Sequence, residues 1–326
     1  MLKKIKNKLR PKVKGKLPIA LIGASGWGGN YLHRLSLSKD FDINIVMDIN
    51  QNVLKHIEKK YGYRTVTDID DIINSEVNTV FIVLPNHLHF EVAKQLLENG
   101  KNVYIEKPLA NSSDEAKLLN QIAYKNGVIL YTCHNLAYES YMLKVKEFIQ
   151  NGTIGKVYGI EIEGSLPTAF SMRDNDWRND SVSCPFGPLM QLGIHFIDYL
   201  NNIFGEFTIE YGAIGSNVIK NDDYFYGVIN YGDISCKLKF SYISHNVFKI
   251  VINAEKFDLS FNGKELTKFY HNGKTENITF NQSDSLTVSI DEFYMFIQDK
   301  NIKSNTLRAI NSIESIERVG IYAREV

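Results

Sequence analysis

A glycine-rich segment, Gly23–Gly29, lies between a short apolar run ending at Ile22 and a stretch with the apolar spacing of a helix. The free backbone N–H groups of such a turn, with the positive end of the helix dipole, suit the pyrophosphate of a dinucleotide. In the G-x-G-x-x-G pattern, the second glycine lets the backbone approach the phosphates, and Ser25 replaces it here. A tight turn that binds nothing is the alternative explanation of such an imperfect pattern.

A carboxylate at the end of the second predicted strand strengthens the dinucleotide interpretation. Asp48 lies 20 residues after Gly28, where it can bind both ribose hydroxyls of NAD. Its charge would repel the 2′-phosphate of NADP, so NAD is the predicted cofactor and NADP the less favoured one. The candidate cofactor-binding residues of this region are Gly23, Ser25, Gly26, Trp27, Gly28 and Asp48.

Three further segments carry side chains that could act on a substrate. Pro85–His89 follows the third predicted strand and Glu106–Pro108 the fourth, while Gly187–Asp198 belongs to a predicted helix. They resemble the T-P-N-x-x-H, E-K-P and G-G-x-L-x-D-x-G-x-H-x-x-D motifs of the glucose–fructose oxidoreductase / inositol dehydrogenase (Gfo/Idh/MocA) family. The resemblance covers Leu17–Val326, which is the whole chain except its basic N-terminal tail.

The resemblance implies a Rossmann domain followed by a substrate domain built on an open sheet. It also implies oxidation of a sugar or cyclitol hydroxyl, or reduction of the ketone, with a nicotinamide cofactor. Lys107 matches the family's catalytic lysine and His195 its active-site histidine, while Pro108 would shape the turn that aims Lys107, with a cis bond before it as an open alternative. The implied cofactor contacts are Pro85, Asn86, His89, Glu106 and Lys107, with packing as the alternative role of His89.

The residue types themselves agree with this chemistry. Removal of a hydride from a C–H bond requires the attached hydroxyl to lose its proton. Lys107, at the carboxyl end of a strand, can supply positive charge near that oxygen, and His195 can relay the proton at neutral pH. For each residue alone, the alternative is structural: a solvated strand end for Lys107 and a hydrogen-bonded helix histidine for His195.

The sequence departs from the family pattern at two substrate-side positions. Gln191 stands four residues before His195, where the family usually has Asp, and glutamine can neither carry charge nor accept a proton. Ala137, before Tyr138, replaces a frequent arginine. Two alternatives to a redox enzyme therefore stay open: a cofactor-binding protein without turnover in a regulatory or partner role, and internal NAD cycling within a non-redox net reaction.

Two neighbouring side chains suggest how a sugar nucleotide could be bound. Trp177 offers a stacking ring and Arg178 a bidentate partner for phosphate or carboxylate. The predicted catalytic residues are Lys107, His195 and Gln191. The predicted substrate contacts are Lys107, Tyr138, Trp177, Arg178, Gln191 and His195.

Short apolar runs alternate with helical patterns up to Cys133, which predicts an α/β, doubly wound parallel sheet. Its strands are expected at 19–22, 43–47, 80–84, 103–105 and 128–131. Beyond Cys133, helices at 140–150 and 189–204 precede alternating runs with hairpin signals such as Asn262-Gly263, which predicts an α+β domain with a large, mostly antiparallel open sheet. Aromatic residues of these strands could form an oligomer face or simply a core: Phe240, Tyr242, Phe248, Phe257 and Phe261.

We expect residues 17–133 to form the dinucleotide-binding domain and 134–326 the substrate and oligomerisation domain, in a homodimer or homotetramer. Packing of the last helix, from about residue 307, on the first domain is an open alternative. The three cysteines are odd in number and have no metal spacing, which favours reduced thiols and the cytoplasm. His87, His89, His134 and His195 match no zinc pattern, so no metal is predicted.

The formal net charge of zero combines two unlike regions. Residues 1–16 carry eight basic and no acidic side chains, while the remaining 310 residues carry a net −8. An acidic body argues against nucleic-acid binding, which needs a positive face. The tail is expected to be solvated, although the spacing of Leu2, Ile5 and Leu9 leaves a weak membrane-surface helix as an alternative.

Overall fold

The computed structural model describes residues 15–280, 282–299 and 305–325, and it divides into two compact units. The first unit contains residues up to Glu106, Lys117–Cys133 and Ile290–Thr306. The second contains Lys107–Ala116, His134–Ser289 and the residues from Leu307 on. Residues 1–14 of the expected basic tail, with the proposed membrane-surface helix, lie outside the described residues.

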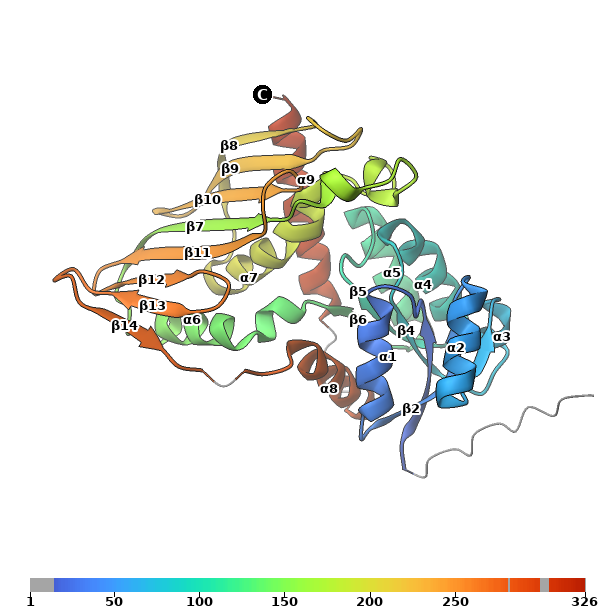
Figure 1. Ribbon diagram of the computed structural model, residues 1–326. Helices are drawn as coiled ribbons and strands as arrows, with labels where there is room; N and C mark the ends of the chain where they lie inside the picture. The colour runs from blue at the N-terminus through green and yellow to red at the C-terminus, as the bar shows by residue number, and fades with distance from the viewer. Residues whose placement is uncertain (1–14, 281, 300–304, 326) are drawn as a thin grey trace, which may run out of the picture. The chain divides into compact units, whose positions relative to one another are not determined.

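The first unit is built on a six-stranded sheet in which all pairings are parallel, with the order β3-β2-β1-β4-β5-β6 (Figure 1). This confirms the predicted doubly wound sheet. Only β3 was not predicted, because three residues with one buried side chain give no apolar run. The strands are β1 (Leu17–Ile22), β2 (Phe41–Met47), β3 (Arg64–Val66), β4 (Thr79–Ile82), β5 (Asn102–Glu106) and β6 (Leu130–Cys133).

Aromatic side chains fill one face of this sheet. Phe81 of β4, Tyr104 of β5 and Tyr131 of β6 lie in one register row, and the ring of Phe293 lies 5.4–5.6 Å from each of theirs. Phe293 belongs to α8 (Ser285–Gln298), a helix that the sequence analysis did not predict. The other helices of this region are α1 (Gly28–Leu37), α2 (Gln51–Tyr61), α3 (Asp70–Ile73), α4 (His89–Glu98) and α5 (Ser113–Asn126).

The second unit contains an eight-stranded sheet of order β14-β13-β12-β11-β7-β10-β9-β8 (Figure 1). Every pairing is antiparallel except β7 with β10, which confirms the mostly antiparallel prediction. The strands are β7 (Val157–Ser165), β8 (Thr208–Gly215), β9 (Tyr224–Tyr231), β10 (Ile234–Ser241), β11 (Val247–Ala254), β12 (Asp258–Phe261), β13 (Leu266–Phe269) and β14 (Thr275–Ile278).

Helices α6 (Ser140–Gln150), α7 (Ile194–Phe204) and α9 (Thr306–Glu325) pack on this sheet. Tyr141 of α6 stacks on Phe261 with ring centroids 3.9 Å apart, and Phe196 of α7 lies 5.7 Å from Phe240. Phe240, Tyr242, Phe257 and Phe261 are buried within the chain. These four therefore belong to the core and do not form an oligomer face, whereas Phe248 is half-buried.

Among the described residues, no helix is long and apolar enough to cross a membrane.

Candidate active site

The glycine-rich turn has the close backbone approach that its sequence predicts. Gly23 has a φ of +83°, and a Cβ added there would lie 2.1 Å from the carbonyl oxygen of Val83. A Cβ on Gly28, the first residue of α1, would lie 2.0 Å from the carbonyl oxygen of Gly23. Only glycine fits at either position, so strand β1 passes directly into the N-terminus of α1. Gly26 and Trp27 lie exposed at the tip of this turn.

Ser25 and Asp48 bond to each other across this turn. Asp48 is buried, and its Oδ2 accepts hydrogen bonds from Ala24 N (2.8 Å), Ser25 N (2.9 Å) and Ser25 Oγ (2.9 Å). Its Oδ1 accepts one bond, from Asn50 N at 2.8 Å. Since each carboxylate oxygen has about two acceptor sites, Oδ1 retains capacity for a ribose hydroxyl. The serine that breaks the glycine pattern is thereby anchored to the predicted ribose-binding carboxylate.

The segment after β4 places a buried amide beside this sheet edge. Asn86 is 4% exposed and its Nδ2 has no hydrogen-bond partner among the described residues. Asn86 begins a 3-10 turn (Asn86–Leu88), and α4 starts at His89 with no side-chain cap. His89 is fully buried, with Nε2 2.9 Å from the carbonyl oxygen of Leu84, so it packs within the unit; Pro85 is half-buried.

Glu106, at the end of β5, binds the start of α1. Its Oε1 accepts a hydrogen bond from Trp27 Nε1 at 3.0 Å and another from the hydroxyl of Tyr31. This pairing holds the indole of Trp27, which is 55% exposed, beside the turn. The donor set of the first unit fits a dinucleotide: a helix N-terminus without side chains in the way, an acidic residue at the end of β2, and an unpartnered buried amide.

The predicted catalytic residues come together within the second unit. Lys107 precedes a cis peptide bond to Pro108, and its Nζ donates to the main-chain oxygen of Gln191 at 2.9 Å. Gln191 lies in a π-helical turn (Leu189–Gly193) that leads into α7, where the sequence predicted one continuous α-helix. Such turns are frequent at functional sites. Its Nε2 is buried without a nitrogen or oxygen partner among the described residues, and the side chain lies close enough to the Cys184 thiol to oppose the rise in the pKa of that thiol that burial causes.

His195 stands in the first turn of α7 as a neutral base. Burial lowers its pKa well below the ordinary value, and the positive charge of Lys107 and the neighbouring His134 lower that pKa further. The imidazole is therefore neutral at physiological pH, and its Nδ1 is buried without a hydrogen-bond partner in the described structure. A neutral imidazole beside a lysine can accept a proton.

A polar network that the sequence analysis did not predict supports this helix. Asp198, buried on α7, accepts hydrogen bonds at Oδ1 from Arg308 Nε (2.7 Å) and Ser312 Oγ (2.9 Å), and at Oδ2 from a second guanidinium nitrogen. His134 Nδ1 lies 3.7 Å from Asp198 Oδ2. Arg308 and Ser312 lie more than 100 residues further along the chain, in α9, and no local pattern marks them.

The two buried members of this network differ in charge. Burial lowers the pKa of His134 to about 4, assisted by Arg308 and Lys107 and opposed by Asp198. Burial alone would raise the pKa of Asp198, but His134, Arg308 and the bond from Ser312 hold it below the ordinary value. His134 is therefore neutral and Asp198 ionised at neutral pH.

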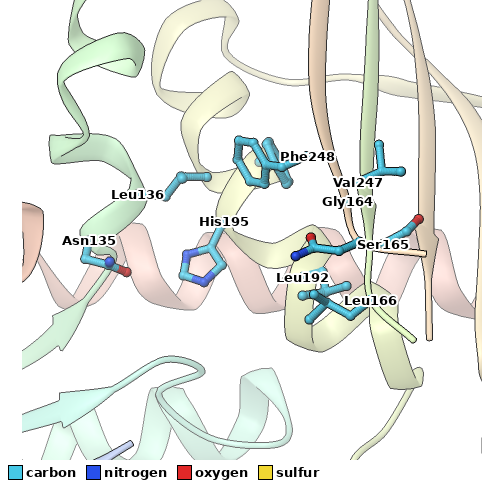
Figure 2. Close-up of a pocket in the computed structure, with 11 residues that line it drawn as sticks. Asn135, Leu136, Gly164, Ser165, Leu166, Leu192, His195, Val247 and Phe248 are labelled. Carbon is cyan, nitrogen blue, oxygen red and sulfur yellow. The ribbon is translucent and has the colours of Figure 1, made fainter. Parts of the chain in front are cut away.

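A cavity of about 230 Å³ lies beside His195 (Figure 2). Of the predicted substrate contacts, only His195 lines it. Tyr138 belongs to the same 3-10 turn (Asn135–Tyr138) as two lining residues without lining the cavity itself. The lining residues are Asn135, Leu136, Gly164, Ser165, Leu166, Leu192, His195, Phe196, Asn246, Val247 and Phe248.

Trp177 and Arg178 bond mainly to their own segment. The guanidinium carbon of Arg178 lies 4.3 Å from the centroid of the Trp177 ring, and Nη1 lies 3.2 Å from Asp176 Oδ1. A substrate phosphate would have to compete with Asp176 for this cation. No group of three or more side chains suited to a metal occurs in the part of the chain that the structure describes.

Comparison with known proteins shows the family to which the chain belongs and the fold that it shares. Residues 17–134 match the Gfo/Idh/MocA model described as an oxidoreductase family with an NAD-binding Rossmann fold, and residues 142–259 match the C-terminal domain of that family. The glucose-6-phosphate 3-dehydrogenase of Bacillus subtilis (strain 168) is 30% identical over 225 residues, which is 68% of this chain and 64% of that protein. The chain therefore aligns with less than two thirds of this relative's length.

Solved structures share the fold over nearly the whole chain. KijD10, a 3-ketoreductase from Actinomadura kijaniata in complex with NADP and TDP-benzene, has a TM-score of 0.86 at 15% identity, covering 94% of this chain and 98% of that one. A levoglucosan dehydrogenase in complex with NADH and levoglucosan has a TM-score of 0.81 at 16% identity, covering 95% and 98%. At these identities the likeness establishes the fold alone.

Proposed function

Because the chain belongs to the Gfo/Idh/MocA oxidoreductase family, we propose that it is an NAD(P)-dependent dehydrogenase or reductase. Its substrate is the hydroxyl or keto group of a sugar, cyclitol or sugar nucleotide. The main support is the 2.9 Å hydrogen bond from Lys107 Nζ to the main-chain oxygen of Gln191, one helical turn before His195. A fixed ammonium and a neutral base are the groups that deprotonation of an alcohol requires.

In this proposal, each of the chain's own residues has a separate role in the reaction. When bound, the nicotinamide accepts a hydride from the alcohol carbon or returns one to the ketone. Lys107 stabilises the negative charge that develops on the substrate oxygen, and the Gln191 carbonyl holds the ammonium in place. His195 accepts the hydroxyl proton at a ring nitrogen during oxidation and returns it during reduction.

The cofactor-binding residues belong to the first unit. The backbone of Gly23–Gly28 would hold the pyrophosphate at the N-terminus of α1. Asp48 Oδ1 would accept a hydrogen bond from a ribose hydroxyl, and Asn86 Nδ2 would donate one to another acceptor of the cofactor. We propose NAD as the preferred cofactor, because a 2′-phosphate would meet the Asp48 carboxylate. Titration calorimetry with NAD and NADP, on the protein and on Asp48→Ser, tests this preference.

Turnover is the direct test of the proposed reaction. The formation or consumption of reduced nicotinamide, followed by absorbance with a panel of sugars and cyclitols, should be detected for the native protein and lost in Lys107→Ala. Equal rates in both proteins would show that Lys107 does not take part in the reaction.

One observation favours a second candidate. Gln191 occupies the position where the family usually has an acid, so the proton path from His195 lacks a carboxylate there. The missing carboxylate is consistent with a protein that binds the cofactor without turnover, or with one that cycles the cofactor within a non-redox net reaction. Tight NAD binding with no turnover on any sugar supports the former. Product formation with no net change in NADH supports the latter.

We also propose a homodimer or homotetramer in the cytoplasm. The outward side of the eight-stranded sheet, with exposed Tyr158, Tyr211 and Tyr226, is available for assembly in the described chain. The three cysteines are buried and form no disulfide in the described structure, as expected in a reducing compartment. Light scattering after size-exclusion chromatography gives the mass directly, and a monomer would contradict the assembly proposal.

A further inference from the structure

His134 is a buried titratable residue to which the proposed reaction gives no role. It follows β6 and is 2% exposed, and the 3-10 turn after it packs against α7. Asn135, the next residue, lines the same cavity as His195 (Figure 2). Neither ring nitrogen of His134 has a hydrogen-bond partner among the described residues. Most buried polar atoms in proteins are hydrogen-bonded, so two without partners on one ring indicate a role beyond packing.

The carboxylate of Asp198 favours one of the two nitrogens of His134 as the carrier of the hydrogen. Nδ1 of His134 lies 3.7 Å from Oδ2 of Asp198, which is too far for a hydrogen bond but close enough for electrostatic attraction. Arg308 and Ser312 of α9 hold this carboxylate with three hydrogen bonds. A neutral imidazole has a single N–H, and a nearby carboxylate favours that N–H on the nitrogen closest to it. His134 is therefore expected to carry its hydrogen on Nδ1 and a lone pair on Nε2.

His195 lies on the same face of α7 as Asp198. The two residues are three positions apart in the helix, a spacing that makes their side chains neighbours. His134 is also close enough to His195 for its charge to lower the pKa of that residue. The charged and titratable groups around His134 are thus Asp198 and His195 of α7, Arg308 of α9 and Lys107. All of them belong to the second unit.

The buried nitrogen of His195 needs a hydrogen-bond acceptor if this residue is to act as a base. Nδ1 of His195 is enclosed in the unit without a partner among the described residues, so a substrate proton has to be taken at Nε2. Nε2 can accept that proton only when the single hydrogen of the neutral ring is on Nδ1. A buried N–H at Nδ1 requires an acceptor, and the lone pair on Nε2 of His134 is of the right kind. In catalytic triads, a carboxylate fixes the tautomer of the base in the same way.

We propose that His134 is a positioning residue, which accepts a hydrogen bond from Nδ1 of His195 and thereby keeps Nε2 of His195 free to take the proton of the substrate. During oxidation, that proton passes from the substrate hydroxyl to Nε2 of His195 while the hydride goes to the nicotinamide, and the hydrogens on Nδ1 of both histidines stay in place. The positive charge that forms on His195 is stabilised by the ionised Asp198, one helical turn further along α7. The inference rests on the proposed function for the role of His195 as the base.

The tautomers of the two histidines can be measured directly by NMR. The full-length protein, labelled with ¹⁵N in histidine and saturated with NAD, is examined at neutral pH by a two-bond ¹H–¹⁵N correlation, which distinguishes N–H from lone-pair nitrogens. His134→Gln and His195→Asn identify the signals of the two rings among the eight histidines by the loss of those signals. Both rings should be neutral, with the hydrogen on Nδ1. A hydrogen on Nε2 of His195 in the native protein would overturn the proposal.

Two variants of His134 separate positioning from a structural role. His134→Phe keeps a ring but removes the acceptor, and kcat should fall about a hundredfold, the lower end of the contribution of general acid–base catalysis. KM should stay within about threefold, because His134 is not among the described residues that line the cavity. His134→Gln can place its amide oxygen near the position of Nε2 and should restore kcat to within about tenfold of the native value.

Ser315→Ala is the matched control for the packing of α7 on α9. It removes another hydrogen bond between these helices, the one that Asn201 donates to Ser315 Oγ at 2.9 Å, and should leave kcat within about twofold. An equal loss of kcat in His134→Phe and His134→Gln would overturn the proposal, as would a native kcat in His134→Phe. If His134→Phe does not fold, as judged by circular dichroism, the tautomers of the native protein decide.

The NMR measurement also separates this inference from the proposed function. If the native protein turns over no sugar, a hydrogen on Nδ1 of His195 that moves to Nε2 in His134→Phe would support the contact between the two histidines, while the proposed redox function would be rejected. The same tautomer of His195 in both proteins would overturn the inference whatever the turnover.

Discussion

Two substitutions in the family pattern, one in each unit, have opposite structural consequences. Ser25, in the glycine-rich turn, donates its hydroxyl to Asp48 at 2.9 Å and its backbone N–H to the same oxygen. Gln191, before His195, has a buried Nε2 whose one interaction in the described structure is a weak one with the Cys184 thiol, while its main-chain oxygen binds Lys107. The first substitution is compensated within the turn. The second places a buried neutral amide, with only a weak sulfur contact, where the family usually has an acid.

The difference indicates which of the two units departs further from the family pattern. A compensated change should affect the cofactor little, because it keeps the turn and its carboxylate in place. A neutral amide at position 191, where the family usually has an acid, removes a negative charge from the turn that leads to His195. The second unit is therefore expected to respond strongly to substitution and the turn weakly.

Lys107→Ala should produce the largest effect. Loss of the ammonium removes the charge that stabilises the substrate oxygen, and we expect kcat to fall about a thousandfold. The affinity for NAD, measured by calorimetry, should stay within about threefold. Lys125→Ala, at an exposed position of α5, is the matched control. Retention of more than a tenth of the native kcat would contradict the assignment.

The buried imidazole of His134 should make the protein sensitive to acid. Its pKa is about 4 when folded and about 6.5 when exposed, so the unfolded chain binds the extra proton below pH 6.5. Its contribution to stability is complete above that pH and is lost progressively down to pH 4, about 3 kcal/mol in total. Urea denaturation across this range should therefore show a shallower pH dependence for His134→Asn. An identical slope in both proteins would show that His134 is not buried in its neutral form.

Gln191→Asp should have an intermediate effect. A carboxylate near His195 favours the protonated imidazole, which raises its pKa and strengthens it as a base, so kcat should rise about tenfold. The acidic limb of the pH–rate profile should move to higher pH at the same time. Gln191→Asn adds no charge and is the control. A fall in kcat with Asp would mean that glutamine is adapted to this substrate.

Ser25→Gly should produce the smallest effect. The variant restores the usual glycine and removes one hydrogen bond to Asp48, a partly buried contact that contributes about 1 kcal/mol. The dissociation constant for NAD, from calorimetry, should change less than about fivefold. A tenfold or larger loss of affinity for NAD would show that the serine holds Asp48 in its binding position and that the turn does not tolerate substitution.

The sequence predicted the fold well because local signals agreed with it. Continuous apolar runs predicted the strands of the parallel sheet. The dipeptide Asn262-Gly263 predicted a hairpin, which the structure contains between β12 and β13. Strand β3 and helix α8 had no clear apolar pattern in the sequence and were not predicted. The role of Phe293 in α8 emerges only when four strands meet around its ring.

The candidate site could be predicted only in part. Lys107, Gln191 and His195 lie in motifs, so their types and spacing were visible. Ser165 lies beside Val247 through the pairing of β7 with β11, about 80 residues apart, and Arg308 reaches Asp198 from the last helix. Such partners are fixed by tertiary packing, and no local pattern encodes them.

Isotope transfer tests the central claim most directly. A neutral sugar that carries deuterium at the reacting carbon is incubated with the protein and NAD, and the reduced nicotinamide is analysed by mass spectrometry. A dehydrogenase transfers the deuterium, so the label should appear in NADH and should be lost in Lys107→Ala. Unlabelled NADH, or deuterium that returns to the sugar product without net NADH, would contradict the proposed reaction.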